Sequence, residues 1–180
     1  IYCLDKVYEH SDYIAVNISS PNTQKLRDLS KVEHLDDLLK IIKSKQLELS
    51  SEYGYRPIFI KISPDESSDS LRDICNAILK NNLDGIICTN TTINHSHKNG
   101  LGGLSGRPLK KRATDILIRV RELIGDKLPI IASGGVMTPE DYLEKMNAGA
   151  DLVQIYTGFI FEGPKLIADI VNLDSRARNT

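Results

Sequence analysis

Residues 129–135 read PIIASGG, and residues 151–158 read DLVQIYTG. Each segment contains a short, mainly apolar run, at 129–132 and 151–156, and ends in hydroxyl and glycine residues. Short runs rich in Ile and Val are typical of buried strands, so both runs are predicted to be strands. Glycine lets a backbone approach a ligand closely, and exposed backbone N–H groups bind anions. The two strand ends therefore predict a shared phosphate site, with ordinary structural turns as the alternative.

Similar runs lie upstream, at 13–18 (YIAVNI), 57–62 (PIFIKI) and 85–88 (GIIC). Their near-continuous hydrophobicity indicates burial on both faces, as in a parallel sheet. Helical periodicity fills the remaining stretches, at 32–50, 68–81, 113–124, 138–148 and 165–173. The fourth helix has the clearest boundaries, with Thr138 as N-cap, Pro139 at the first helical position and Gly149 just past the end.

Strands that alternate with helices predict an α/β fold with a parallel sheet. Both a barrel and a doubly wound sheet have this pattern. A barrel shares its site among the C-terminal ends of several strands, whereas a doubly wound sheet concentrates it at one switch point. All the runs end in polar or small residues, at 17–20, 61–63, 89–91, 133–135 and 156–158. We therefore predict a (β/α)8 TIM barrel, of which this chain supplies roughly the last five β/α units.

No linker or low-complexity segment divides the chain, which begins without Met and inside a helical pattern. We expect residues 1–180 to be the C-terminal part of a single barrel domain, with the first strands and the N-terminal helices outside this sequence. Such a part has two open sheet edges. We expect it to be inactive alone and to leave Val16, Ile60 and Ile131 less buried than a closed barrel would.

The composition argues against several classes of function. A net charge of −1, from 23 basic and 24 acidic residues, does not suit a nucleic-acid partner. The three cysteines form no C-x-x-C pair, so neither a disulfide framework nor a metal site is expected, and a reducing compartment fits better. No stretch of the sequence approaches the roughly 20 apolar residues of a membrane-spanning helix.

Polar residues at the strand ends are the candidates for ligand binding. The segment 17–23 (NISSPNT) suits the alternating donors and acceptors of a pyrimidine edge, or forms an ordinary polar turn. Lys61 interrupts an apolar strand, where its ammonium needs water, a salt bridge, or a flavin or phosphate group. The segment 100–106 (GLGGLSG) fails the dinucleotide-binding pattern because position 105 is Ser, and it either lies against a ligand or is simply flexible.

With these residues assembled, the chain resembles class 2 dihydroorotate dehydrogenases over nearly its whole length. The matching blocks, in order, are 17–23, 61–62 with 64–65, 84–85 with 89–92, 102–108, 129–135, and 152–156 with 163–164. The resemblance implies an FMN-binding barrel that oxidises dihydroorotate to orotate, a step in the de novo synthesis of UMP, with a quinone reoxidising the flavin.

The same resemblance implies roles for individual residues. Ser20 matches the catalytic base, a position that holds Cys in class 1 enzymes. A serine is a poor base at its ordinary pKa and needs a relay to water or to a neighbouring hydroxyl, for which Thr23 is one candidate. The substrate contacts implied are Asn17, Asn22, Asn90 and Thr91. The FMN contacts implied are Asn17, Lys61, Thr89, Ser105, Gly106, Gly135, Tyr156 and Thr157.

The chain departs from the family pattern in places. Ser133 stands where many relatives have another small or apolar residue, and the short segment 94–100 leaves the length of a substrate lid open. The family's N-terminal helices form a membrane-associated quinone tunnel, and they have no counterpart in this sequence. The quinone site is therefore expected mainly outside it, and the implied location is peripheral, at a bacterial or mitochondrial inner membrane.

Two alternative functions are weighed against this interpretation. A dihydrouridine-synthase-like FMN reductase would need a basic surface for tRNA, which the net charge of −1 does not supply. A non-catalytic half-barrel is the other alternative, and the intact set of Ser20, Lys61 and asparagines argues against it.

Overall fold

The structure is a computed structural model that describes residues 1–20, 32–95 and 102–178. Its sheet has five parallel strands in the order of the chain: β1 (Ile14–Asn17), β2 (Ile58–Ile62), β3 (Gly85–Cys88), β4 (Ile130–Ser133) and β5 (Leu152–Gln154). A doubly wound sheet reverses its strand order at a switch point, whereas a barrel does not. The unbroken order therefore confirms the α/β fold and supports the barrel.

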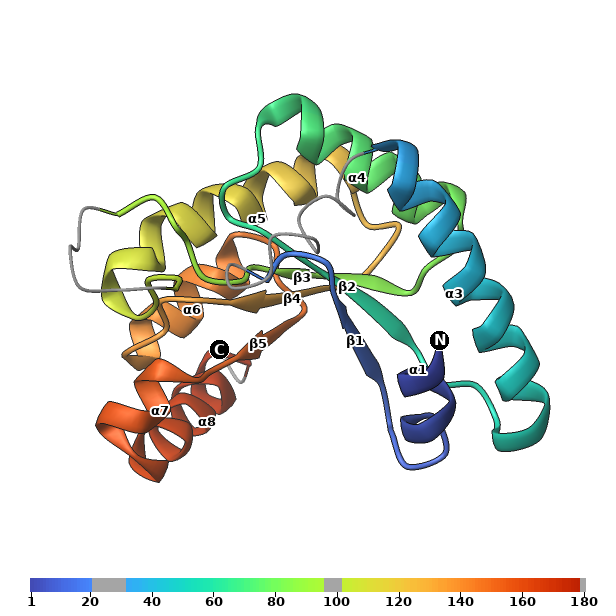
Figure 1. Cartoon of the computed structure of the whole chain (residues 1–180). Helices are drawn as coiled ribbons and strands as arrows, with labels where there is room; N and C mark the ends of the chain where they lie inside the picture. The colour runs from blue at the N-terminus through green and yellow to red at the C-terminus, as the bar shows by residue number, and fades with distance from the viewer. Residues whose placement is uncertain (21–31, 96–101, 179–180) are drawn as a thin grey trace.

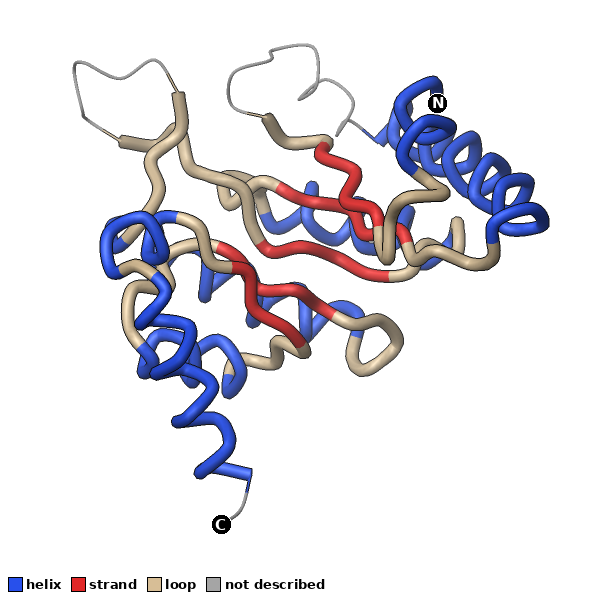
Figure 2. The backbone as a smooth tube through the Cα atoms, turned by 90° about the horizontal axis from the view of Figure 1, so that it is seen from below, coloured by secondary structure: helices blue, strands red, loops and turns tan. Residues whose placement is uncertain are grey.

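Helices precede the first strand, connect each strand to the next and follow the last strand. They are α1 (Tyr2–Val7), α3 (Val32–Tyr53), α4 (Ser68–Lys80), the short 3-10 helix η1 (Arg107–Leu109), α5 (Lys110–Ile124), α6 (Pro139–Asn147), α7 (Thr157–Glu162) and α8 (Pro164–Arg178). Figure 1 shows α3, α4 and α5 along the convex side of the curved sheet, with α7 and α8 beside β5. Figure 2 views the concave side, with the strands in front of the helices.

The helical and strand predictions are confirmed in place and order, with one notable difference near the end. The predicted strand 151–156 covers only Leu152–Gln154 in the structure, because the chain turns at Tyr156 into the short helix α7. Apolar Phe159, Ile160 and Phe161 in this stretch resemble a strand in composition. Their helical conformation was not expected from the sequence.

The main core lies between the convex face of the sheet and the helices. Side chains alternate along β2, so that Ile58, Ile60 and Ile62 are fully buried under the helices while Phe59 and Lys61 belong to the concave side. The expectation that Ile60 would be partly exposed is therefore wrong, since its side chain faces the helix layer.

A small second cluster fills the middle of the concave side. It consists of Phe59, Ile87 and Ile131, from three adjacent strands. Ile131 is 4% exposed, so the expectation of partial exposure fails for it as well, because its two neighbours cover it. Val16, on the end strand β1, is half-buried as expected.

The sheet is an open arc. Among the described residues, β1 pairs only with β2 and β5 pairs only with β4, which leaves one edge of each without a neighbouring strand. Apolar side chains at these ends are solvent-exposed, with Leu152 61% exposed. The arc with a gap matches the arrangement expected for part of a barrel.

The loop after β4 is fixed by the start of α6. Oγ1 of Thr138 accepts a hydrogen bond from N of Asp141, and the Asp141 carboxylate accepts from N of both Met137 and Thr138 at 2.9 and 3.0 Å. The predicted N-cap is therefore confirmed as a reciprocal capping box. Gly149, with φ +99°, follows the end of the helix as predicted.

Candidate active site

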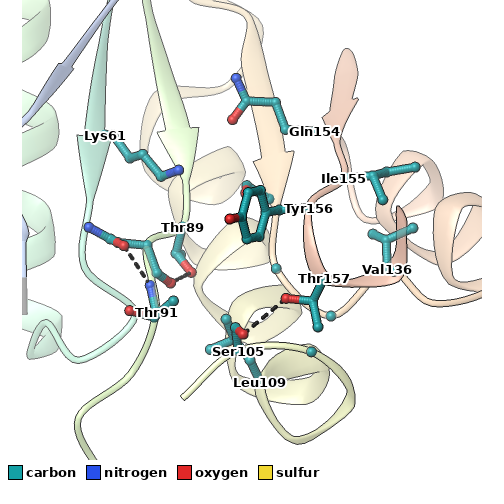
Figure 3. Close-up of a pocket in the computed structure, with 16 residues that line it drawn as sticks. Lys61, Thr89, Thr91, Ser105, Leu109, Val136, Gln154, Ile155, Tyr156 and Thr157 are labelled. Atoms are coloured by element: carbon teal, nitrogen blue, oxygen red, sulfur yellow. Dashed lines mark hydrogen bonds between the residues drawn. The ribbon is translucent and has the colours of Figure 1, made fainter. Parts of the chain in front are cut away.

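The C-terminal ends of β2, β3, β4 and β5 surround a cavity of about 220 Å³ (Figure 3). Many of the residues implied by the resemblance line this cavity. They are Lys61, Thr89, Asn90, Thr91, Ser105, Gly106, Gly135, Tyr156 and Thr157. Residues separated by nearly a hundred positions are thus brought to one place by the parallel order of the strands.

Lys61 projects into the cavity from β2. Its neighbours Ile60 and Ile62 point into the main core, so the alternation of the strand directs Lys61 to the concave side, as Figure 3 shows. Partial burial lowers the pKa of its ammonium group. None of the ion pairs between described residues includes Lys61, so its charge is available to an anionic ligand in the cavity.

Asn90 connects the ends of β1 and β3. Its Nδ2 donates to Oδ1 of Asn17 at 3.2 Å, to the carbonyl oxygen of Ser19 at 3.1 Å and to Oγ of Ser19 at 3.3 Å. Its Oδ1 accepts from N of Thr91 at 2.8 Å. Ser19 completes the network by donating from Oγ to the carbonyl oxygen of Lys61 at 2.9 Å. These bonds hold two carboxamides side by side at the rim.

The polar segment after β3 is anchored from outside the cavity by Asp65. The Asp65 carboxylate accepts hydrogen bonds from Oγ1 of Thr92 at 2.6 Å and from N of Ile93 at 2.9 Å. Arg112 on α5 forms an ion pair with the same carboxylate at 3.0 Å. Thr92 also exchanges two backbone hydrogen bonds with Leu104, which brings both ends of the intervening loop together.

Glycines that follow β4 and β5 form another wall of the cavity, because side chains would not fit there. A Cβ atom on Gly135, where φ is +78°, would lie 2.2 Å from Cα of Lys110. A Cβ on Gly158 would lie 2.2 Å from the carbonyl oxygen of Val136. Both glycines therefore permit a close approach of backbone segments that a larger residue would prevent.

Several backbone N–H groups of this wall have no hydrogen-bond acceptor among the described residues. They belong to Gly135, Val136, Thr157 and Gly158, all of which line the cavity. Backbone donors that are shielded from water are nearly always paired in folded proteins. Val136 is only 3% exposed and Gly135 and Gly158 are also buried, so these donors could bind the oxygens of an anion in the cavity.

Ser105 joins the segment before η1 to this wall. Its Oγ accepts a hydrogen bond of 2.9 Å from Oγ1 of Thr157, drawn as a dashed line in Figure 3. Gly106 has φ +70°, and a Cβ there would lie 3.0 Å from the Thr157 side chain. The glycine-rich segment therefore lies, at Ser105 and Gly106, against Thr157 at the start of α7 rather than forming a free loop there.

The structure describes only part of the segment that contains the predicted base. Ser20 is half-buried, three residues beyond the end of β1, and it does not line the cavity. Asn17 is exposed and reaches the cavity wall through Asn90. Asn22 and Thr23 lie outside the described residues, so their predicted contacts stay predictions.

Two polar residues of the site were not predicted from the sequence. Gln154 lines the cavity from the end of β5, on the same face of the strand as Leu152 two residues earlier. Ser19 is 4% exposed and bonds to Asn17 and Asn90, although it stood out only as one of several polar residues after β1. Alternation along the strand would have identified Gln154.

No helix in the described part of the chain is long and apolar enough to cross a membrane.

A family model described as "Dihydroorotate dehydrogenase" matches residues 1–174. Proteins named "Dihydroorotate dehydrogenase (quinone)" are similar to the chain. The one from Vibrio parahaemolyticus is 52% identical over 95% of this chain and 53% of its own length, and the one from Aliivibrio salmonicida is 51% identical over 96% and 53%.

Solved structures agree with the sequence relatives. The dihydroorotate dehydrogenase of Eimeria tenella in complex with ferulenol superimposes with a TM-score of 0.89 at 32% identity, covering 98% of this chain and 53% of that one. The ligand-free form gives 0.86 at 34% identity, covering 94% and 52%. The chain thus spans about half the length of the relatives that it matches, and it belongs to the dihydroorotate dehydrogenase family.

Proposed function

We propose that the full-length protein containing this chain oxidises dihydroorotate to orotate with FMN as cofactor and a quinone as final electron acceptor. The family implies a flavin cofactor, and the relatives named as quinone-dependent favour this activity over that of a dihydrouridine-synthase-like reductase. The observation that carries the proposal is the convergence of nine predicted ligand residues on one cavity at the C-terminal ends of four strands.

The residues present fit FMN in two respects. The acceptor-free N–H groups at Gly135, Val136 and Thr157 suit a phosphate, which parallel barrels often bind after their seventh and eighth strands. The half-buried Lys61 ammonium suits a ring system that becomes negative on reduction. Both groups face the same cavity, so one ligand can meet both.

The volume of the cavity suggests that part of the binding site lies elsewhere. At about 220 Å³ it is smaller than most complete small-molecule sites, which occupy about 300–1,000 Å³. Lys61, which belongs to the concave side of the sheet, lines this cavity. We therefore propose that residues 1–180 are the C-terminal part of one FMN-binding (β/α)8 domain, and that its remaining strands complete the site.

The polar residues at the rim would bind the substrate. Asn17 and Asn90 have carboxamide groups that offer donors and acceptors to a pyrimidine ring, and Thr91 lies beside them. Their mutual hydrogen bonds hold the carboxamides in place, which favours a near-attack geometry. Asn22 would be a further contact.

Ser20 would remove the proton from C5 of dihydroorotate. A flavin bound in the cavity would supply the acceptor for the hydride that leaves C6. A serine hydroxyl is a weak base at its ordinary pKa, so Ser20 needs a relay that takes its proton, and Thr23 is the neighbouring hydroxyl that we propose for this role. Lys61 would contribute positive charge to the cavity wall, at the side where reduction builds negative charge.

The partners and location of the full-length protein follow the same reasoning. We propose that the quinone binds mainly to the part of the protein outside this chain. We also propose peripheral attachment to a bacterial or mitochondrial inner membrane, through helices outside this chain, because a quinone acceptor resides in the bilayer.

The test is to purify the full-length protein and record its visible absorbance and its reaction with dihydroorotate. We expect stoichiometric FMN, bleaching of the flavin by dihydroorotate, and turnover when a soluble quinone is added. Bleaching without turnover on quinone would contradict the acceptor, whereas reaction with dihydrouridine but not dihydroorotate would favour the alternative reductase.

A further inference from the structure

Lys145 is a lysine of α6 that is almost completely buried, at 1% exposure. Its Nζ donates to Oγ1 of Thr114 at 2.6 Å and to the carbonyl oxygen of Lys110 at 3.2 Å. Both acceptors belong to the first two turns of α5. An ammonium group taken out of water costs several kcal/mol unless other charges compensate it, so this position calls for an explanation.

The charges of Lys110, Asp141 and Glu144 sum to zero only when the charge of Lys145 is added. Lys110 forms ion pairs with Asp141 at 2.5 Å and with Glu144 at 2.7 Å. Among the described residues no carboxylate oxygen lies in ion-pair range of Lys145 itself, and Thr114 connects it to Glu144 through a hydrogen bond of 3.1 Å. The two lysines and two carboxylates together are neutral. Without Lys145 the cluster would carry one net negative charge.

This cluster lies directly behind the glycine wall of the cavity. The Asp141 carboxylate holds N of Met137 and N of Thr138, immediately after the acceptor-free N–H groups of Gly135 and Val136. Gly135 in turn packs against the backbone of Lys110, whose carbonyl oxygen Lys145 binds. The carboxylate that shapes the loop is therefore a like charge close to the place where an anion would bind.

We infer that Lys145 is a positioning residue for the phosphate of the cofactor, offsetting the charge of Asp141 and Glu144 and fixing the first turn of α5 behind the glycine loop. This inference rests on the proposed FMN site. Because Lys145 is shielded from water, its charge acts through a medium of lower dielectric constant than the partly exposed Lys110 does. Its influence should be specific to the phosphate and absent for the rest of the flavin.

A comparison of FMN with riboflavin, which lacks the phosphate, tests this specificity. The dissociation constants of both would be measured with the flavin-free full-length protein and its Lys145→Met variant, which keeps the length of the side chain but not its charge. We expect Lys145→Met to weaken FMN binding by about tenfold or more, the scale of one charge removed from a partly desolvated site, and to leave riboflavin binding unchanged. Lys111→Met, an exposed lysine on α5, is the matched control and should change neither.

A second measurement needs no mutation. Burial lowers the pKa of Lys145 to about 8, so raising the pH through this value removes its charge. The ionisable groups around it are Lys110 and Asp115 on α5, Asp141 and Glu144 on α6, and Cys88 on β3. The carboxylates stay ionised over this range, the pKa of Lys110 is raised by Asp141 and Glu144, and burial raises that of Cys88. The preference for FMN over riboflavin should therefore fall as the pH rises through about 8 in the unmodified protein.

The outcomes separate this inference from the proposed function. An equal loss of FMN and riboflavin binding in Lys145→Met would mean a general structural role and would overturn the inference. So would an unchanged FMN preference, or, if the variant does not fold, a flat pH profile in the unmodified protein. Absence of flavin binding in the unmodified protein would instead refute the proposed cofactor.

Discussion

Gln154 donates a hydrogen bond of 2.9 Å from Nε2 to the hydroxyl oxygen of Tyr13, although the two residues lie at opposite ends of the sheet. The Tyr13 ring also meets Phe59 edge to face, with centroids 5.7 Å apart. Strands β1 and β5 do not pair with each other, so this contact spans the concave side of the arc. Such strong curvature is what turns the ends of separate strands toward one cavity.

Replacing Ser20 tests the predicted base. In the full-length protein, Ser20→Ala should keep FMN and bind dihydroorotate with roughly unchanged affinity. Reduction of the flavin by dihydroorotate should slow by about 10²-fold or more, as is usual when a general base is lost. Stopped-flow absorbance measures this step directly. Near-normal reduction would show that another group takes the proton.

Replacing Asn90 tests the carboxamide network. Asn90→Ala removes the group that donates to Asn17 and Ser19 and accepts from Thr91. We expect the dissociation constant of orotate to rise by about tenfold or more, since lost hydrogen bonds to a polar ligand leave buried groups unpaired, while FMN content stays full. Titration of the flavin spectrum with orotate measures the change. Asn172→Ala, at an exposed position on α8, serves as the control.

The strand order and the cluster at the strand ends could be predicted because they follow from local patterns. Apolar runs identify strands, and residues such as Lys61 and Thr89 mark the ends of those runs. The buried cluster of Lys110, Thr114 and Lys145 could not be predicted, because a lysine on an amphipathic helix normally reaches solvent. Only the packing of α6 against α5 shows that Lys145 does not.

Lys61→Ala should weaken FMN binding. The variant removes a half-buried ammonium that has no ion-pair partner among the described residues and faces the cavity. We expect substoichiometric flavin after purification, and a lower reduction potential for any flavin retained, because positive charge favours the reduced form. Lys165→Met, at an exposed site on α8, should retain full flavin. Full flavin content with a normal potential in Lys61→Ala would refute the assignment.

Gly135→Ala should be far more damaging than the same change at another glycine of positive φ. The added Cβ would lie 2.2 Å from Cα of Lys110, whereas a Cβ on Gly125 would meet nothing within 4 Å. We expect Gly135→Ala to lose FMN and to cost about 3 kcal/mol or more in stability, from strain and overpacking together. Gly125→Ala, at φ +56° and ψ −142°, should show only the backbone strain, about 1–3 kcal/mol, and keep the flavin. Flavin content and denaturant unfolding compare the two, and similar results would contradict the close packing.

Residues 1–180 expressed alone should be aggregated or poorly folded and should bind FMN weakly at best. Strands β1 and β5 each have an edge without a partner, and unpaired strand edges promote association. Apolar area on the open side is also uncovered, including Leu152 at 61% exposure and Tyr156 at 79%. Size-exclusion chromatography, a thermal melt and flavin absorbance would test this. Co-expression with the remainder of the full-length protein should restore a soluble species with stoichiometric FMN, because the further strands that we propose for it would cover both edges. A soluble monomer of residues 1–180 with a cooperative melt and one FMN per chain would instead show that these five units form a complete domain by themselves.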